Sequence, residues 1–142
     1  MALYVESSAI LAWIFGEAAG EHARKVINSV RPVVSSTLSV LEVERAVRRA
    51  LSVGSISEAD AVNLQSLFRS VSRGWEFMEM TPEIQRRAAE SFPVEPLRSL
   101  DALHLATVLS FLELYSDLAV LSFDARILDN LRALGVPIPA DV

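Results

Sequence analysis

The sequence has no cysteine and only two histidines, His22 and His104. The absence of cysteine excludes disulfide bonds, thiolate metal ligands and a cysteine nucleophile, and it is typical of a reducing compartment such as the cytoplasm. No apolar run reaches the roughly 18–20 residues that a membrane-spanning helix needs, and no basic segment precedes an apolar stretch after Met1, as in a secretory signal. We therefore expect a cytoplasmic protein with no membrane association, in which oxygen atoms supply most ligands of any metal.

Positive charge is also scarce. The 18 Asp and Glu residues outnumber the 13 Lys and Arg residues, which gives a formal net charge of −5, and Lys25 is the sole lysine. Tight, non-specific binding of nucleic acid usually needs a basic surface that neutralises phosphates, so this balance disfavours it. An enzyme whose acids hold divalent cations remains compatible, because the cations reverse the local charge.

The composition is that of a packed protein. Of 142 residues, 51% are hydrophobic and 22% are charged, and no repeat or linker interrupts them, so we expect one domain over residues 1–142. Apolar periodicity predicts alternating strands and helices. The expected strands are residues 3–5, 32–34, 75–80, 118–121 and 136–138, with 75–80 at an edge. The expected helices are residues 9–15, 21–30, 38–51, 82–91, 100–114 and 124–134, and a further helix that opens at residues 57–60, carries apolar residues from 62 to 71 and ends at Gly74.

Residues that favour helix ends support several of these boundaries. Ser36 and Ser99 precede expected helices and are favoured N-cap types. Ser57 and Asp60 have the spacing of a capping box, and Gly135 closes the last helix. The strands are short and apolar without strict alternation, which is typical of strands buried on both faces. The sequence therefore predicts a three-layer α/β/α sandwich around a mainly parallel sheet of about five strands.

Four acidic residues follow expected strands or lie near the start of the helices behind them. They are Glu6, Glu42, Asp101 and Asp124. Ligands of open α/β sheets bind at the carboxyl ends of the strands, so we expect these acids to meet there. Clustered carboxylates raise one another's proton affinity unless cations join them, and Mg²⁺ or Mn²⁺ prefer such oxygen ligands. The pattern predicts a metal site able to activate water for phosphodiester hydrolysis.

Each acid also has a structural interpretation. Asp124 is well placed to cap a helix, and Asp101 lies where the helix dipole favours an acid. Glu42 could pair with Arg45, three residues along the helix. Against this, Asp101 begins an otherwise apolar helix face, where burying an unpaired carboxylate is unfavourable.

Other polar residues near the acids have two interpretations as well. Ser8 could cap the first helix or hold a carboxylate or a metal-bound water, and Ser122 could do the latter. Arg98 and Arg126 could bind phosphates of a substrate or be ordinary exposed charges. His104, one turn after Asp101, is more often a core residue than a metal ligand.

Four segments carry a resemblance to a known family. Residues 4–9, Tyr-Val-Glu-Ser-Ser-Ala, resemble the opening of PIN-domain proteins, whose first strand ends in Asp-Thr/Ser-Ser-Ala. Residues 36–46 are similar to the second motif, in which a Glu precedes Arg-Ala by three residues, and this register selects Glu42 over Glu44. Residues 97–106 and 121–126 resemble the motifs around the last two acids. The four motifs occur in the family's order across essentially the whole chain.

The resemblance implies a five-stranded parallel sheet, Mg²⁺- or Mn²⁺-dependent endoribonuclease activity and a homodimer. For VapC-like toxins, which are similar in length, it further implies an RNA substrate and a cognate antitoxin that blocks the site. One residue departs from the pattern, because the family's first acid is normally Asp and here it is Glu6. The additional methylene moves the carboxylate, and Mg²⁺ demands near-ideal octahedral geometry.

Three hypotheses follow from the sequence. The first is a metal-dependent endoribonuclease toxin whose ion is held by the four acids. The second is a PIN-like module that binds RNA or a protein partner without cutting, with Glu6 marking decay of the site. The third is a phosphoacceptor or phosphatase-like domain; it is disfavoured because such sites usually need a lysine and Lys25 has no evident link to the acids.

Overall fold

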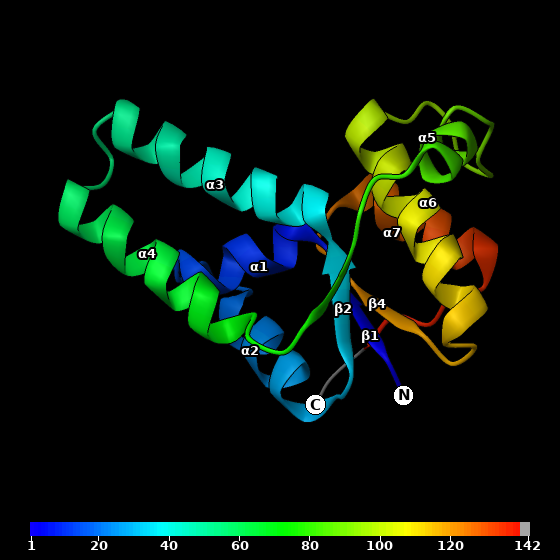
Figure 1. Cartoon of the computed structure of the whole chain (residues 1–142), viewed down its shortest axis with the longest axis horizontal. Helices are drawn as coiled ribbons and strands as arrows, with labels where there is room; N and C mark the ends of the chain where they lie inside the picture. The colour runs from blue at the N-terminus through cyan, green and yellow to red at the C-terminus, as the bar shows by residue number, and fades with distance from the viewer. Residues whose placement is uncertain (140–142) are drawn as a thin grey trace.

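The chain folds around a small parallel sheet (Figure 1). The computed structural model describes residues 1–139. The strands are β1 (Leu3–Val5), β2 (Val33–Ser36), β3 (Glu76–Met78) and β4 (Ala119–Leu121). Within the described residues they form one sheet in the order β3-β2-β1-β4, with every pair parallel. The expected parallel sheet is confirmed, and so is the edge position of β3.

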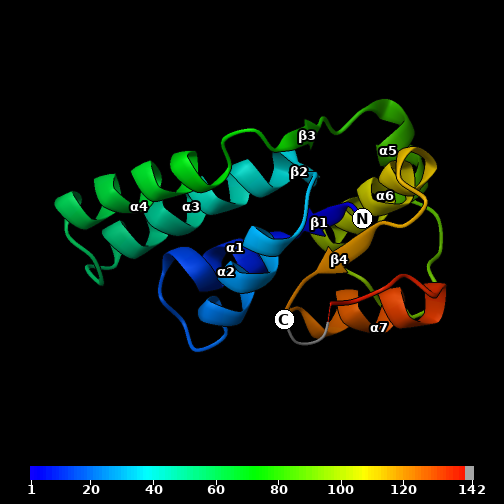
Figure 2. The same cartoon turned by 90° about the horizontal axis from the view of Figure 1, so that it is seen from below.

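The helices lie on the two sides of this sheet (Figures 1 and 2). One side carries α1 (Ser7–Ile14), α2 (Gly20–Ser29), α3 (Thr37–Ser52) and α4 (Glu58–Val71). The other side carries α5 (Pro82–Ala88), α6 (Ser99–Leu114) and α7 (Ala125–Leu134). Figure 2 also shows that the hairpin of α3 and α4 extends well beyond the sheet.

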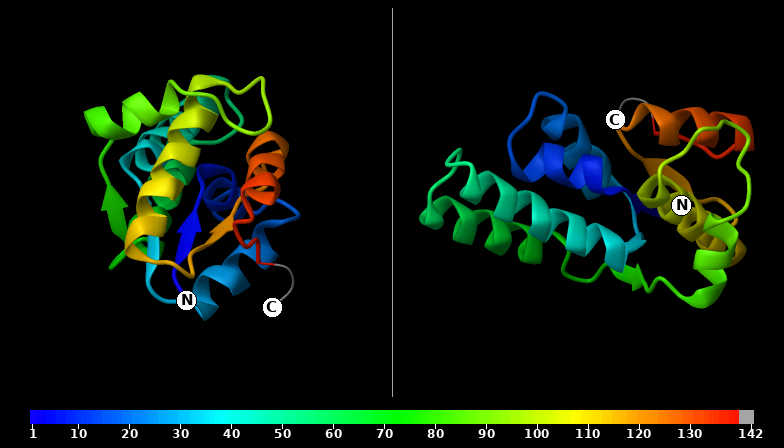
Figure 3. Two further views of the ribbon diagram at one scale, coloured as in Figure 1. Left: turned by 90° about the vertical axis from the view of Figure 1, so that its right-hand side faces the viewer. Right: turned by 90° about the horizontal axis from the view of Figure 1, so that it is seen from above.

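Alternating strand residues fill two separate cores. Leu3 and Val5 of β1 pack on the side of α1 and α2, whereas Tyr4 between them packs on the side of α6 and α7. In β4, likewise, Val120 faces opposite to its neighbours. Figure 3 shows α6 lying across one face of the sheet with α7 beside it. Strands buried on both faces confirm the expected α/β/α sandwich.

The predicted fifth strand at residues 136–138 is wrong. This segment runs beside β4 and makes one sheet-like bond, from the Val120 N–H to the Pro137 carbonyl (2.9 Å), but it is not a strand. The next bond of a parallel ladder would need the N–H of residue 139, and that residue is Pro139, which has none. Prolines therefore end the sheet at β4.

The ends of α3, α4 and α7 follow the expected chemistry. Ser36 caps α3, Ser57 and Asp60 form a complete capping box on α4, and Gly135 ends α7 with a φ of 71°. Ser99 is not an N-cap: it is the first residue of α6, and Arg98 occupies the cap position without a side-chain bond. In the part of the chain that is described, no helix combines the length and the apolar character needed to cross a bilayer.

Candidate active site

A pocket of about 310 Å³ opens at the carboxyl ends of the strands. All four predicted acids line it, together with Arg98 and His104. Glu6 follows β1 and Asp124 follows β4, which are neighbouring strands, while Glu42 lies in the second turn of α3 and Asp101 in the first turn of α6. Parallel strands end at the same edge, so residues that are distant in sequence meet here. The four acids therefore line one pocket, as the sequence led us to expect.

Glu6 is buried and held by several donors. Its side chain is the N-cap of α1 and accepts a hydrogen bond from the Ser8 N–H (2.9 Å). The hydroxyls of Ser7 (2.6 Å), Ser8 (2.5 Å) and Ser122 (2.6 Å) also donate to its two oxygens. The interpretation of Ser8 as the cap is therefore wrong: Glu6 caps the helix, and Ser8 lies inside it and fixes the carboxylate.

The serines also connect Glu6 to the segment after β4. The Ser8 hydroxyl accepts from the Phe123 N–H (2.8 Å), and the Ser122 hydroxyl accepts from the Asp124 N–H (3.1 Å). This network joins the end of β1 to the end of β4. It fixes the backbone that carries two of the four acids.

Asp101 and Asp124 are joined by one arginine. The Arg98 guanidinium donates to both oxygens of Asp101 (3.0 and 3.4 Å) and to Asp124 (3.1 Å). The bond to Asp101 raises the pKa of Arg98 above its usual value. Asp124 also caps α7 through its other oxygen, which accepts from the Arg126 and Ile127 amides. Both interpretations of Asp124, as a cap and as a pocket residue, thus hold geometrically.

Glu42 faces His104 rather than Arg45. Its Oε1 lies 2.5 Å from the imidazole Nε2, and the other ring nitrogen lies 2.8 Å from the Tyr4 hydroxyl. Among the ion pairs of residues 1–139 there is none between Glu42 and Arg45. His104 is thus part of the acidic site. In the sequence, the one indication of this role was that His104 lies one turn after Asp101.

The predicted substrate arginines lie in different places. Arg98 lines the pocket with a side chain that is 62% exposed. Arg126 is exposed at the start of α7 and is not among the residues that line the pocket. Arg98 therefore contacts the acids directly, whereas Arg126 lies outside the lining of the pocket.

The ligand atoms suit a hard divalent cation, but each of the four carboxylates is already hydrogen-bonded to another side chain. Four carboxylates around one pocket are the ligand type that Mg²⁺ and Mn²⁺ prefer. Within residues 1–139, no three acidic or histidine side chains converge closely enough to hold an ion as they stand. Serine hydroxyls hold Glu6, His104 holds Glu42, and Arg98 holds both aspartates. An ion would need a local rearrangement, above all of Arg98.

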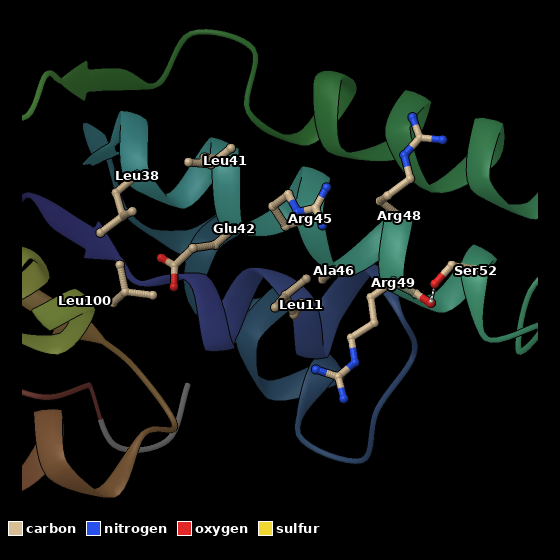
Figure 4. Close-up of a pocket in the computed structure, with 10 residues that line it drawn as sticks. All are labelled: Leu11, Leu38, Leu41, Glu42, Arg45, Ala46, Arg48, Arg49, Ser52 and Leu100. Atoms are coloured by element: carbon tan, nitrogen blue, oxygen red, sulfur yellow. Dashed lines mark hydrogen bonds between the residues drawn. The ribbon is translucent and has the colours of Figure 1, made fainter. Parts of the chain in front are cut away.

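A second, larger groove of about 660 Å³ continues from this pocket along α3 (Figure 4). The two share Leu11, Glu42 and Leu100. Farther along, the groove is lined by three arginines of α3, which are Arg45, Arg48 and Arg49. The spacing of these arginines is helical, but their placement beside the acids depends on the fold. Positive charge is thus concentrated locally in a chain with a net charge of −5.

Comparisons with known proteins agree with this architecture. The fold is similar to VapC20 of Mycobacterium tuberculosis, described as a sarcin-ricin loop cleaving toxin, with a TM-score of 0.67, 18% identity and 99% of each chain covered. It is also similar to a toxin–antitoxin complex from Klebsiella pneumoniae (TM-score 0.64, 17% identity, 100% of each chain covered). A third similar structure is VapBC2 of Rickettsia felis bound to a DNA fragment from its promoter (TM-score 0.67, 8% identity, 98% of each chain covered).

No curated protein matches the sequence significantly. The sequence model of the PIN domain, in contrast, matches residues 3–134, which include every strand of the sheet and all four acids of the pocket. The chain therefore belongs to the PIN domain family.

Proposed function

We propose that this protein is a metal-dependent endoribonuclease and the toxin component of a toxin–antitoxin pair. The observation that carries the proposal is the convergence of Glu6, Glu42, Asp101 and Asp124 on one pocket at the carboxyl ends of β1 and β4. Membership of the PIN domain family and the similarity of the fold to VapC20, described as a toxin that cleaves the sarcin-ricin loop, support it.

In this proposal the four carboxylates hold one or more Mg²⁺ or Mn²⁺ ions. The bound metal would supply activation of a water and stabilisation of the phosphate oxygens. Glu6 contributes a carboxylate fixed by three serines, and Asp101 and Asp124 contribute oxygens from two further elements. Arg98, once released from the aspartates, and Arg126 at the edge of the site would donate hydrogen bonds to phosphates of the RNA.

The proposed partners are RNA as the substrate, a cognate antitoxin that blocks the site, and a second copy of the chain in a homodimer, all in the cytoplasm. The complexes from Klebsiella pneumoniae and Rickettsia felis support an antitoxin partner, because a chain of each complex has a fold similar to this one. The arginines of the groove beside Glu42 support RNA binding, since they provide the basic surface that the overall composition lacks.

A second candidate is a PIN-like module that binds RNA or protein without cutting. Two observations favour it. Glu6 replaces the aspartate that the family motif usually has and is engaged by four hydrogen bonds. The acids among residues 1–139 also do not converge on an ion position as they stand, and Arg98 bonds two of them.

Cleavage of RNA by the purified chain separates the two candidates. The chain is incubated with total RNA and Mn²⁺, with and without EDTA, beside Asp101→Asn. Asp129→Asn is the matched control, because Asp129 is exposed on α7 and outside the pocket. We expect cleavage by the unchanged chain and the control, and none with EDTA or with Asp101→Asn. Absence of cleavage in every metal condition, with a gel shift of RNA retained, would instead establish the binding module.

A further inference from the structure

His104 is the most buried polar side chain that faces the acidic pocket. It is only 1% exposed, although it lines the pocket beside Asp101. The two residues are three apart on α6 and so share one face of the helix. Its Nε2 lies 2.5 Å from Glu42 and 4.0 Å from Glu6. The imidazole therefore stands between acids that come from two other elements.

The hydrogen bonds of the imidazole define its orientation. An ionised Glu42 can only accept, so the Nε2 of His104 carries a hydrogen and donates it. In the neutral ring the Nδ1 is then an acceptor, and it faces the Tyr4 hydroxyl at 2.8 Å. The phenolic O–H of Tyr4 is a donor at hydrogen-bonding distance from this acceptor, so Tyr4 donates to it. The direction of donation is thus from Tyr4 to His104 to Glu42.

Without this chain of hydrogen bonds, Glu42 would have a competing partner. Its side chain is 23% exposed and lies three residues before Arg45, which also lines the adjacent groove. Residues with this spacing are neighbours on a helix surface. His104 instead holds the carboxylate toward the pocket. Because His104 and Asp101 lie on the same helix, the bond also fixes the acid of α3 relative to an acid of α6.

We propose that His104, oriented by Tyr4, is a positioning residue that sets the Glu42 carboxylate for metal binding. The inference rests on the proposed function, because it assigns Glu42 to a metal site. His104 itself is not a ligand in this arrangement: both of its nitrogens are engaged by protein groups. Outer partners of metal ligands typically change metal affinity by about 10- to 100-fold when they are removed.

The test is titration of the full chain with Mn²⁺ by calorimetry, which does not depend on RNA cleavage. His104→Leu removes both hydrogen bonds, and we expect it to weaken Mn²⁺ binding about 10- to 100-fold. His104→Gln places an amide N–H near the position of Nε2 and should restore most of the affinity. Thr107→Val is the matched control: it is buried one turn further along α6 and bonds only within that helix, so its affinity should equal that of the unchanged chain.

Tyr4→Phe gives a second measurement in case His104→Leu fails to fold. It keeps the ring volume, removes the donor to Nδ1 and should weaken Mn²⁺ binding several-fold. Unchanged affinity in Tyr4→Phe and in every folded His104 variant would overturn the positioning role while leaving the metal site intact. If the unchanged chain binds no Mn²⁺, the metal dependence of the proposed function fails, and this inference falls with it.

Discussion

Glu6→Asp introduces the acid that the family motif usually has, yet the structure predicts that it destabilises this chain. The Glu6 carboxylate accepts from three serine hydroxyls and one amide at 2.5–2.9 Å. Aspartate is shorter by one carbon–carbon bond, about 1.5 Å. It can still accept from the Ser8 amide, because Asp is a favoured N-cap. It cannot also reach Ser122, which directly follows the neighbouring strand β4.

The magnitude follows from the bonds that are lost. A hydrogen bond to a charged group contributes about 1.5–3 kcal/mol. Loss of the Ser122 bond, with weakening of a second, should lower the free energy of unfolding by about 3 kcal/mol. Domains are typically stable by only about 5–15 kcal/mol, so the effect is large. For a chain of this size it corresponds to a fall in Tm of roughly 10 °C.

Urea unfolding followed by circular dichroism in metal-free buffer measures this change. Glu83→Asp is the matched control, because Glu83 is an exposed acid in the first turn of α5, and it should stay within about 0.5 kcal/mol of the unchanged chain. A Glu6→Asp variant as stable as the unchanged chain would refute the reasoning. It would mean that the backbone after β1 relaxes to bring aspartate back to all of its donors.

Three further predictions concern Arg98, Asn130 and Tyr4. Arg98→Ala should strengthen Mn²⁺ binding in a calorimetric titration and Arg126→Ala should not, because only Arg98 bonds both aspartates; equal affinities would reject competition between Arg98 and the metal. Asn130→Ala removes three hydrogen bonds, two of them to the Val94 backbone, and should lower the free energy of unfolding by about 3 kcal/mol in urea; a loss below about 1 kcal/mol would contradict this. Burial and nearby acids raise the pKa of Tyr4, so the folded state holds that proton more tightly than the unfolded state. The resulting stability is intact below a pH of about 10, the usual pKa of tyrosine, and is lost as the pH rises above it. Tyr4→Phe should therefore flatten the alkaline fall in stability, and equal slopes for the two proteins would contradict the assignment.

The sequence predicted where the acids lie better than it predicted what they contact. Glu6 and Asp124 directly follow apolar strands, and parallel strands end at a common edge, so their meeting follows from the fold class alone. Glu42, in contrast, had Arg45 one turn away and His104 62 residues away. Sequence spacing favours the local partner, and only the packing of α6 against the sheet selects the distant one.

The fifth strand illustrates a different error. The apolar residues at 136–138 matched a strand by hydrophobicity, and the segment does run beside β4. The two prolines that prevent the ladder were visible in the sequence, since proline cannot donate to a neighbouring strand. The backbone donors were thus the decisive property, and hydrophobicity was not sufficient.

The partners of the four acids differ in how they would respond to a cation. The four hydrogen bonds to Glu6 use about all of its lone pairs, so an ion there would displace a neutral donor, whereas the imidazole N–H leaves lone pairs free on Glu42. Among the partners described between residues 1 and 139, Arg98 is the one that brings a full positive charge to its carboxylates, so it would compete with a metal for the same oxygens and repel it. Its side chain is 62% exposed, and the released guanidinium can be solvated by water. Of these partners, Arg98 is therefore the one whose movement away from Asp101 and Asp124 would most directly allow the acids to bind a metal.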